Sequence, residues 1–127
     1  MTRGRCVLSP IVRSPGPYSI VEGDSTEHVR VVVLSGELDI AATPRLRARV
    51  DETASGQALV LDLSRTSFID SAVLKELLRA RDELAERDIR FVLAGVPAPV
   101  RRLLDLTRTS ELFEDAPDVA EAVRRLS

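Results

Sequence analysis

The sequence predicts a single α/β domain with a mixed, mostly parallel sheet of four to five strands and about four helices. Strand-like and helix-like segments alternate from residue 28 onward, with short connections between them. This alternation is typical of parallel strands joined by right-handed helical crossovers. Within 58–86, a nearly continuous apolar run is followed by apolar residues at helical spacing, as in a buried strand leading into a helix. Residues 17–127 are expected to form the domain, and residues 1–16 a flexible leader.

Composition and charge exclude several functional classes. The chain has 127 residues and a formal net charge of −2, so it lacks the basic surface that nucleic acid binding requires. Aromatic residues make up only 3% of the sequence, which also disfavours base stacking. No apolar run approaches the roughly 20 residues that cross a membrane, so we expect no membrane contact and a cytoplasmic location. Cys6 is the only cysteine, so we expect neither an internal disulfide nor a cysteine-based metal cluster.

The N-terminal half of the domain predicts a hairpin followed by a helix. Residues 18–21 and 28–34 are strand-like and are joined by a short turn, which indicates an antiparallel pair. The segment 35–39 is expected to leave the second strand. Thr43 is expected to cap a helix with Pro44 in its first turn, where the missing N–H costs nothing.

The C-terminal half predicts the central strand and helix, followed by shorter elements. An apolar strand is expected at 58–63, a turn at 63–67, and a helix from Ser71 with Asp70 as its N-cap. The later elements are a strand at 89–94, a helix near 100–107 with Leu103, Leu104 and Leu106 as its apolar positions, a brief edge strand at 112–113, and a final helix from about 115 with Val119, Ala120, Val123 and Leu126 facing inward.

The sequence gives little support for catalysis. His28 is the only histidine, and it is expected near the opposite end of the sheet from Ser71. Ser71 also lacks the G-x-S-x-G turn that exposes a hydrolase nucleophile. Glu37 and Asp39 are close together, but nothing around them favours acid–base work. No group of side chains has the spacing of metal ligands, so we expect no enzyme activity, no cofactor and no metal.

Asp70 and Ser71 stand where the buried strand is followed by the helix, and two interpretations are open. In the first, Asp70 is a helix cap and Ser71 is an ordinary first-turn residue. In the second, the Ser71 hydroxyl accepts a phosphoryl group, whose charge of about −1.5 to −2 would lie at the positive end of the helix dipole. Such a group would leave the fold intact and would act by repulsion and steric block at a docking surface.

Three short segments occur in a specific order: Leu34–Asp39, Leu61–Ser64 and Phe68–Ala72. Together they resemble the STAS domain family, in particular the bacterial anti-sigma factor antagonists, and the resemblance covers about residues 18–126. It implies a single STAS-like domain and places the family's phosphorylated serine at Ser71. Asp39 matches the family's aspartate in the loop beside that site.

The resemblance also implies a regulatory mechanism. The unphosphorylated protein would bind a cognate anti-sigma factor, which is a serine kinase with a GHKL-type ATP-binding fold, and so release a sigma factor. That kinase would phosphorylate Ser71 and dissociate, and a protein phosphatase would reset the switch. The surface expected to contact the partner comprises Asp39, Asp70, Ser71, Ala72, Val73 and Lys75.

Two positions depart from the family pattern, which usually has glycines two and four residues after the serine. Val73 and Lys75 occupy these positions here. Val73 is expected to stiffen the helix start and to crowd a kinase, while Lys75 adds a positive charge about one turn from Ser71. These replacements keep a second hypothesis open, a STAS adaptor without phosphorylation in a lipid-transport or stress-sensing assembly. A weak homodimer is also left open.

Overall fold

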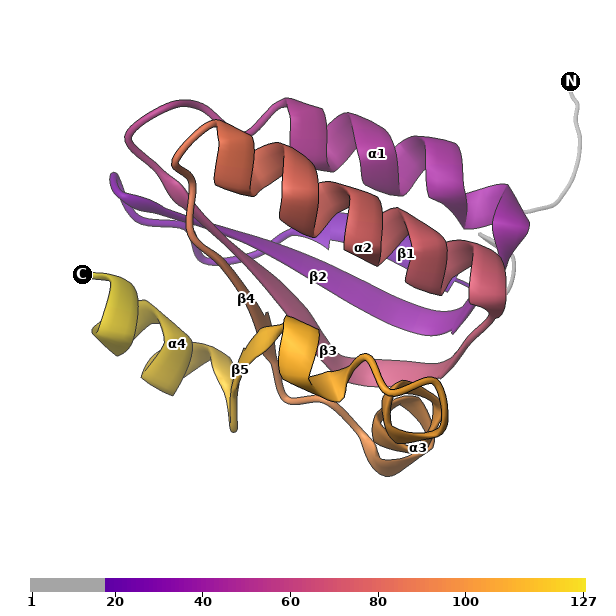
Figure 1. Ribbon diagram of the computed structural model, residues 1–127. Coiled ribbons are helices and arrows are strands. Elements are labelled where there is room, and N and C mark those ends of the chain that lie inside the picture. The colour runs from indigo at the N-terminus through magenta and orange to yellow at the C-terminus, as the bar shows by residue number, and fades with distance from the viewer. Residues whose placement is uncertain (1–17) are drawn as a thin grey trace, which may run out of the picture.

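A computed structural model describes residues 18–127, which form a five-stranded mixed sheet in the order β1-β2-β3-β4-β5 (Figure 1). Strand β1 pairs antiparallel with β2, and the other neighbours pair in parallel. The predicted α/β class, the mixed sheet and the N-terminal hairpin are therefore confirmed. The leader at 1–16 and Cys6 lie outside the described residues. The strands are β1 (Tyr18–Glu22), β2 (Val29–Leu38), β3 (Ala58–Ile69), β4 (Phe91–Ala94) and β5 (Glu114–Ala116).

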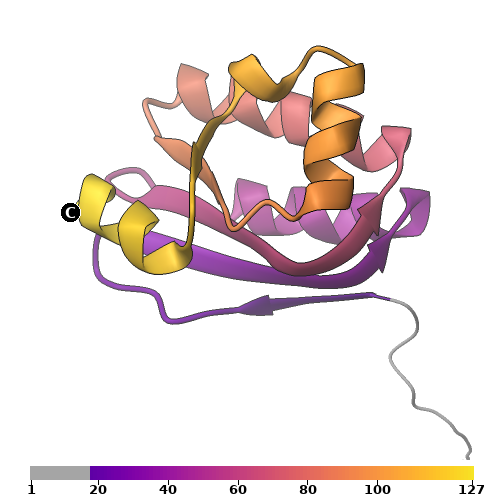
Figure 2. The same cartoon turned by 90° about the horizontal axis from the view of Figure 1, so that it is seen from below.

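Four α-helices and two short 3₁₀ helices in residues 18–127 surround this sheet. Figures 1 and 2 show α1 and α2 side by side over one face, with α4 on the opposite face. None of the helices in the described part of the chain is long and apolar enough to span a bilayer. The helices are α1 (Thr43–Asp51), α2 (Ser71–Glu86), α3 (Ala98–Leu106) and α4 (Val119–Leu126), and the 3₁₀ helices are η2 (Ile40–Ala42) and η3 (Ser110–Leu112).

The hydrophobic core has two parts, one on each face of the sheet. Alternate residues of β3 serve the two parts, because Leu59 and Leu61 pack with α1, α2 and α3, whereas Val60 packs with α4. Strand β3 is thus central and covered on both faces, as its apolar sequence predicts. This burial fixes the position at which β3 ends and α2 begins.

The two strands that lead to this position are longer than the sequence predicts. Strand β2 continues through the segment 35–39 as far as Leu38, and β3 continues through the expected turn at 63–67 as far as Ile69. The two extensions pair with each other, with irregular register on either side of Gly36, whose φ is 84°. The Thr66 hydroxyl, which is buried, also donates a hydrogen bond to the Leu34 carbonyl at 3.1 Å. The prediction of a turn at 63–67 was therefore wrong.

The start of α1 also differs from the prediction. Thr43 is the first residue of α1 and does not cap it, because the helix follows directly from η2. The Thr43 hydroxyl instead donates a hydrogen bond to the Ile40 carbonyl at 2.8 Å. The capping side chain belongs to Asp39, which accepts a hydrogen bond from the Ala41 N–H at the start of η2.

Two C-terminal details, in β5 and α4, correct the sequence prediction, and α3 shows how its apolar residues differ in exposure. The last strand is β5 at 114–116, because Leu112 belongs to η3 instead of the expected edge strand at 112–113. In α3, Leu104 is buried but Leu106 is 76% exposed. In α4, Ala120 is exposed, and Ala122 is the buried alanine. Ala122 completes the i, i+3, i+4, i+7 spacing of one helix face together with Val119, Val123 and Leu126, whereas Ala120 does not fit that spacing.

Candidate functional site

The site lies where β2 and β3 end and α2 begins. Asp70 is the N-cap of α2, and one carboxylate oxygen, Oδ1, accepts a hydrogen bond from the Val73 N–H at 3.0 Å. The other oxygen, Oδ2, accepts a hydrogen bond from the Ile40 N–H at 3.2 Å. The Asp70 N–H donates to the Leu38 carbonyl at 3.2 Å. Asp70 is therefore both the predicted helix cap and a link between the two loops at this end of the sheet.

Asp39 holds the neighbouring loop in shape. Its Oδ1 accepts a hydrogen bond from the Ala41 N–H at 2.9 Å, and its side chain is exposed. The parallel pairing of Leu38 with Ile69 brings the Asp39 loop beside Asp70. The two aspartates singled out from the sequence thus lie on adjacent loops.

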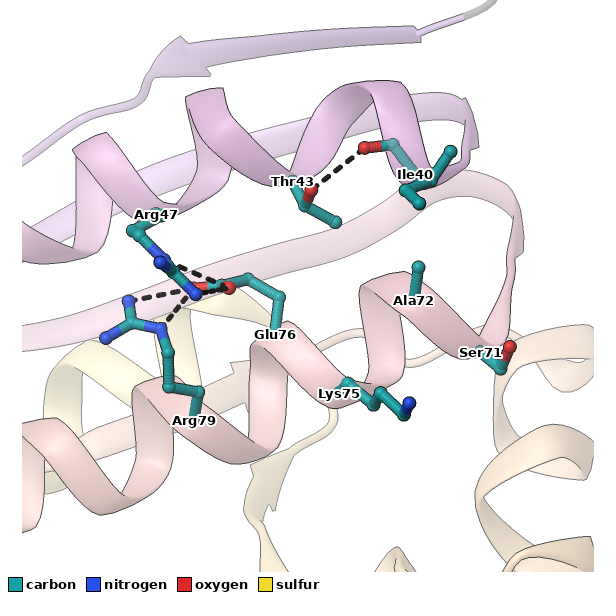
Figure 3. Close-up of a pocket in the computed structure, with 8 residues that line it drawn as sticks. All are labelled: Ile40, Thr43, Arg47, Ser71, Ala72, Lys75, Glu76 and Arg79. Carbon is teal, nitrogen blue, oxygen red and sulfur yellow. Dashed lines mark hydrogen bonds and ion pairs between the residues drawn. The ribbon is translucent and has the colours of Figure 1, made fainter.

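Ser71 is the first residue of α2 and is exposed to solvent. Among residues 18–127, its hydroxyl has no hydrogen-bond partner, whereas the adjacent Asp70 carboxylate is engaged through both oxygens. Figure 3 shows the hydroxyl directed outward at the beginning of the helix. Such an oxygen is accessible to a modifying enzyme, and added negative charge there would lie near unpaired N–H groups of the first helical turn.

A groove of about 370 Å³ runs between α1 and α2 and ends at Ser71 (Figure 3). Glu76 lies in it with only 5% exposure, and it pairs with Arg47 at 3.1 Å and with Arg79 at 2.8 Å. The hydrogen bond that Arg79 donates to the Glu76 carboxylate raises the pKa of Arg79 above its ordinary value. This network joins α1 to α2. The residues that line the groove are Ile40, Thr43, Arg47, Ser71, Ala72, Lys75, Glu76 and Arg79.

The remaining residues of the predicted partner surface differ in exposure. Ala72 is half-buried and Lys75 is exposed, so both side chains are accessible to a partner. Val73 is completely buried in the core beneath α2, so the expectation that it contacts a partner or crowds a kinase was wrong. Its neighbours explain this, because Val73, Leu74 and Leu77 form the buried stripe of the helix.

Sequence reasoning missed two exposed apolar side chains beside the site. Ile40 is 68% exposed and Phe68 is 49% exposed. Ile40 lies in η2 next to Asp39, and Phe68 is two residues before Asp70 at the end of β3. The sequence places Phe68 directly after the polar residues 64–67, but a single apolar residue there does not by itself indicate exposure.

The only histidine lies away from Ser71. His28 is exposed in a separate hollow, together with Gly56, Gln57 and Asp88 at the start of β3 and the end of α2. The fold therefore offers Ser71 no neighbouring imidazole base. Among residues 18–127, no group of three or more His, Cys, Asp or Glu side chains is arranged to hold a metal ion.

The sequence matches the STAS domain family over residues 21–122, and the chain belongs to this family. Within it, the chain is similar to anti-sigma factor antagonists. The anti-sigma-F factor antagonist RsfB of Mycobacterium tuberculosis is 32% identical over 105 residues, which cover 77% of this chain and 85% of that protein.

Solved structures agree with this assignment. A crystal structure of an anti-sigma factor antagonist from Mycobacterium paratuberculosis is 28% identical, covers 89% of this chain and 97% of that chain, and superposes with a TM-score of 0.76. The Bacillus cell fate determinant SpoIIAA, in its phosphorylated form, is 23% identical, covers 86% of this chain and 100% of that chain, and has a TM-score of 0.67. The latter likeness shows a shared fold.

Proposed function

We propose that this chain is an anti-sigma factor antagonist that is switched off by phosphorylation at Ser71. Unphosphorylated, it binds a cognate anti-sigma factor, a serine kinase with a GHKL-type ATP-binding fold, and so frees a sigma factor. The observation that carries this proposal is the exposed Ser71 hydroxyl, which has no hydrogen-bond partner among residues 18–127 and lies beside the braced Asp70 loop. Relatives named as anti-sigma factor antagonists support it.

The catalysis belongs to the partners, and this chain is their ligand and substrate. The kinase transfers the γ-phosphoryl group of ATP to the Ser71 oxygen, the hydroxyl proton passes to a base on the kinase, and ADP leaves. A protein phosphatase returns the hydroxyl by hydrolysis and releases inorganic phosphate. The added charge of about −1.5 to −2 then lies at the centre of the docking surface, where it repels the partner and blocks close approach.

Exposed apolar side chains beside Ser71 suit this docking role. Ile40 in η2 and Phe68 at the end of β3 are both exposed, and Asp70 links these two segments, so the two side chains offer apolar anchors for a partner. Aromatic and aliphatic anchors within a polar surround are the usual source of binding energy in protein interfaces. Asp39, Asp70, Ala72 and Lys75 complete the proposed surface.

The test combines modification with binding. Incubation of the chain with ATP and its anti-sigma factor should add one phosphate at Ser71, seen by intact mass and site mapping, and none to Ser71→Ala. Ser71→Asp should weaken binding to the anti-sigma factor by about 2 kcal/mol, or roughly thirtyfold in Kd. Ser55→Asp is the matched control, because Ser55 is an exposed serine in the turn before β3, and its variant should bind like the unsubstituted chain.

Unchanged affinity of Ser71→Asp would refute the switch. A chain that stays unmodified at Ser71 in cells and co-purifies with a transporter ATPase would point to the adaptor hypothesis instead.

A further inference from the structure

We propose that Lys75 is the residue that responds to the state of Ser71. In the unmodified protein it is a receptor for a carboxylate of the partner, and after phosphorylation it pairs with the phosphoryl group on Ser71. Modification would then remove a cation from the docking surface as well as add an anion. This inference rests on the proposed function and specifies the chemistry of that same site.

The first support is position. Ser71 and Lys75 are four residues apart on α2, so they lie one above the other on one face of the helix. Both are exposed, and both line the groove between α1 and α2. Figure 3 shows the Lys75 amine directed away from Glu76 and toward the end of the helix that carries Ser71. A phosphoryl group on Ser71 therefore lies within the reach of this side chain.

The second support is charge. The other two cations of the groove are already paired, Arg47 with Glu76, and Arg79 with Glu76, Asp51 and Glu83. Lys75, by contrast, has no carboxylate within 4.0 Å among residues 18–127. Its charge is consequently free to act on something outside the domain.

These observations identify the kind of partner group that fits. A chain with a net charge of −2 repels acidic partners on average, so an exposed lysine beside apolar anchors locally reverses that preference. A partner that places a glutamate or aspartate over the groove would gain an ion pair there. A dianionic phosphoryl group on the preceding turn competes for the same amine, and an acid four residues before a lysine is the more favourable orientation on a helix.

The pairing is tested without any partner. Phosphoserine is incorporated at position 71 during synthesis, and the second ionisation of the phosphate is followed by phosphorus NMR. Lys75 should lower the pKa of this phosphate by about 0.3 of a pH unit relative to Lys75→Met. The control is Arg81→Met, since Arg81 is ten residues, roughly 15 Å, further along α2 and beyond the screening length at physiological salt. Equal pKa values with and without Lys75 would overturn the inference.

The use of Lys75 in docking is tested with the unphosphorylated chain and the anti-sigma factor. Lys75→Met should weaken binding by about fivefold and reduce its salt dependence, whereas Arg81→Met should leave both unchanged. The loss caused by Ser71→Asp should be smaller in Lys75→Met, because the variant has no cation left to neutralise. Equal losses in the two backgrounds would overturn the inference while leaving the Ser71 switch in place. If the unsubstituted chain does not bind the anti-sigma factor at all, the proposed function fails, and the NMR result still decides the pairing.

Discussion

Replacing Asp70 with alanine should destabilise the domain by about 2 kcal/mol, because two separate contacts are lost. The first is the N-cap hydrogen bond to the Val73 N–H, and an N-cap is worth about 1 kcal/mol. The second is the exposed hydrogen bond from the Ile40 N–H, which should contribute about another 1 kcal/mol because its acceptor is a charged carboxylate. In a domain of this size the sum corresponds to a fall in Tm of about 8 °C.

Urea unfolding monitored by circular dichroism measures this loss, and two variants divide it. Asp70→Ser keeps a cap for Val73 but cannot reach Ile40 as well, so it should lose about half as much. In α4, the Asp118 carboxylate accepts a single hydrogen bond, from the Glu121 N–H at 2.8 Å. Asp118→Ala removes this cap and should lower the free energy of unfolding by about 1 kcal/mol. Hydrogen exchange at the Ile40 amide should accelerate in both Asp70 variants but not in Asp118→Ala. If Asp70→Ala and Asp118→Ala proved equally stable, the link between the two loops would carry no energy and the reasoning would fail.

Two further predictions concern stability away from the site. The hydrogen bond from Arg30 lowers the pKa of Glu22, so this pair stabilises the fold above the unfolded-state pKa, and the contribution is lost as the pH falls through the lower folded-state value. Glu22→Gln should therefore flatten the decline of unfolding free energy between about pH 5 and pH 3, and an unchanged decline would show that other carboxylates cause it. Leu104→Ala should cost about 3 kcal/mol because Leu104 is buried, whereas Leu106→Gln should change the free energy of unfolding by less than about 0.5 kcal/mol. A large loss for Leu106→Gln in urea titrations would contradict the exposure of this side chain.

The sequence was sufficient for the order and class of the elements, because hydrophobic period is a local signal. It failed at the ends of β2 and β3, where the residues 64–67 are polar and read as a turn. They remain a strand because β2 extends alongside them and supplies hydrogen-bond partners, including the Leu34 carbonyl for Thr66. The local hydrophobic pattern does not specify which strands are neighbours in the sheet. The extension of β3 therefore could not be predicted from it.

The sequence also predicted only part of the site, namely the features that depend on local pattern. The cap role of Asp70 and the exposure of Ser71 follow from the change of period, whereas the contact between Asp70 and Ile40 depends on the register of β2 against β3. The sequence also contains a local signal for the ion pairs of Glu76. Glu76 falls between Leu74 and Leu77 on the buried side of α2, and a carboxylate there requires a partner such as the arginine three residues later.

The contrast between Asp70 and Ser71 explains why the proposed switch uses the serine. Both oxygens of Asp70 hold backbone N–H groups, so any change at that side chain loosens the loops that present Ile40. The Ser71 hydroxyl has no partner to give up among residues 18–127, and the first turn of α2 favours negative charge there. A phosphoryl group on Ser71 can therefore add a charge of about −1.5 to −2 to the docking surface at little cost to the fold. Because the docking surface keeps its shape, hydrolysis of the phosphoester bond at Ser71 is enough to restore partner binding.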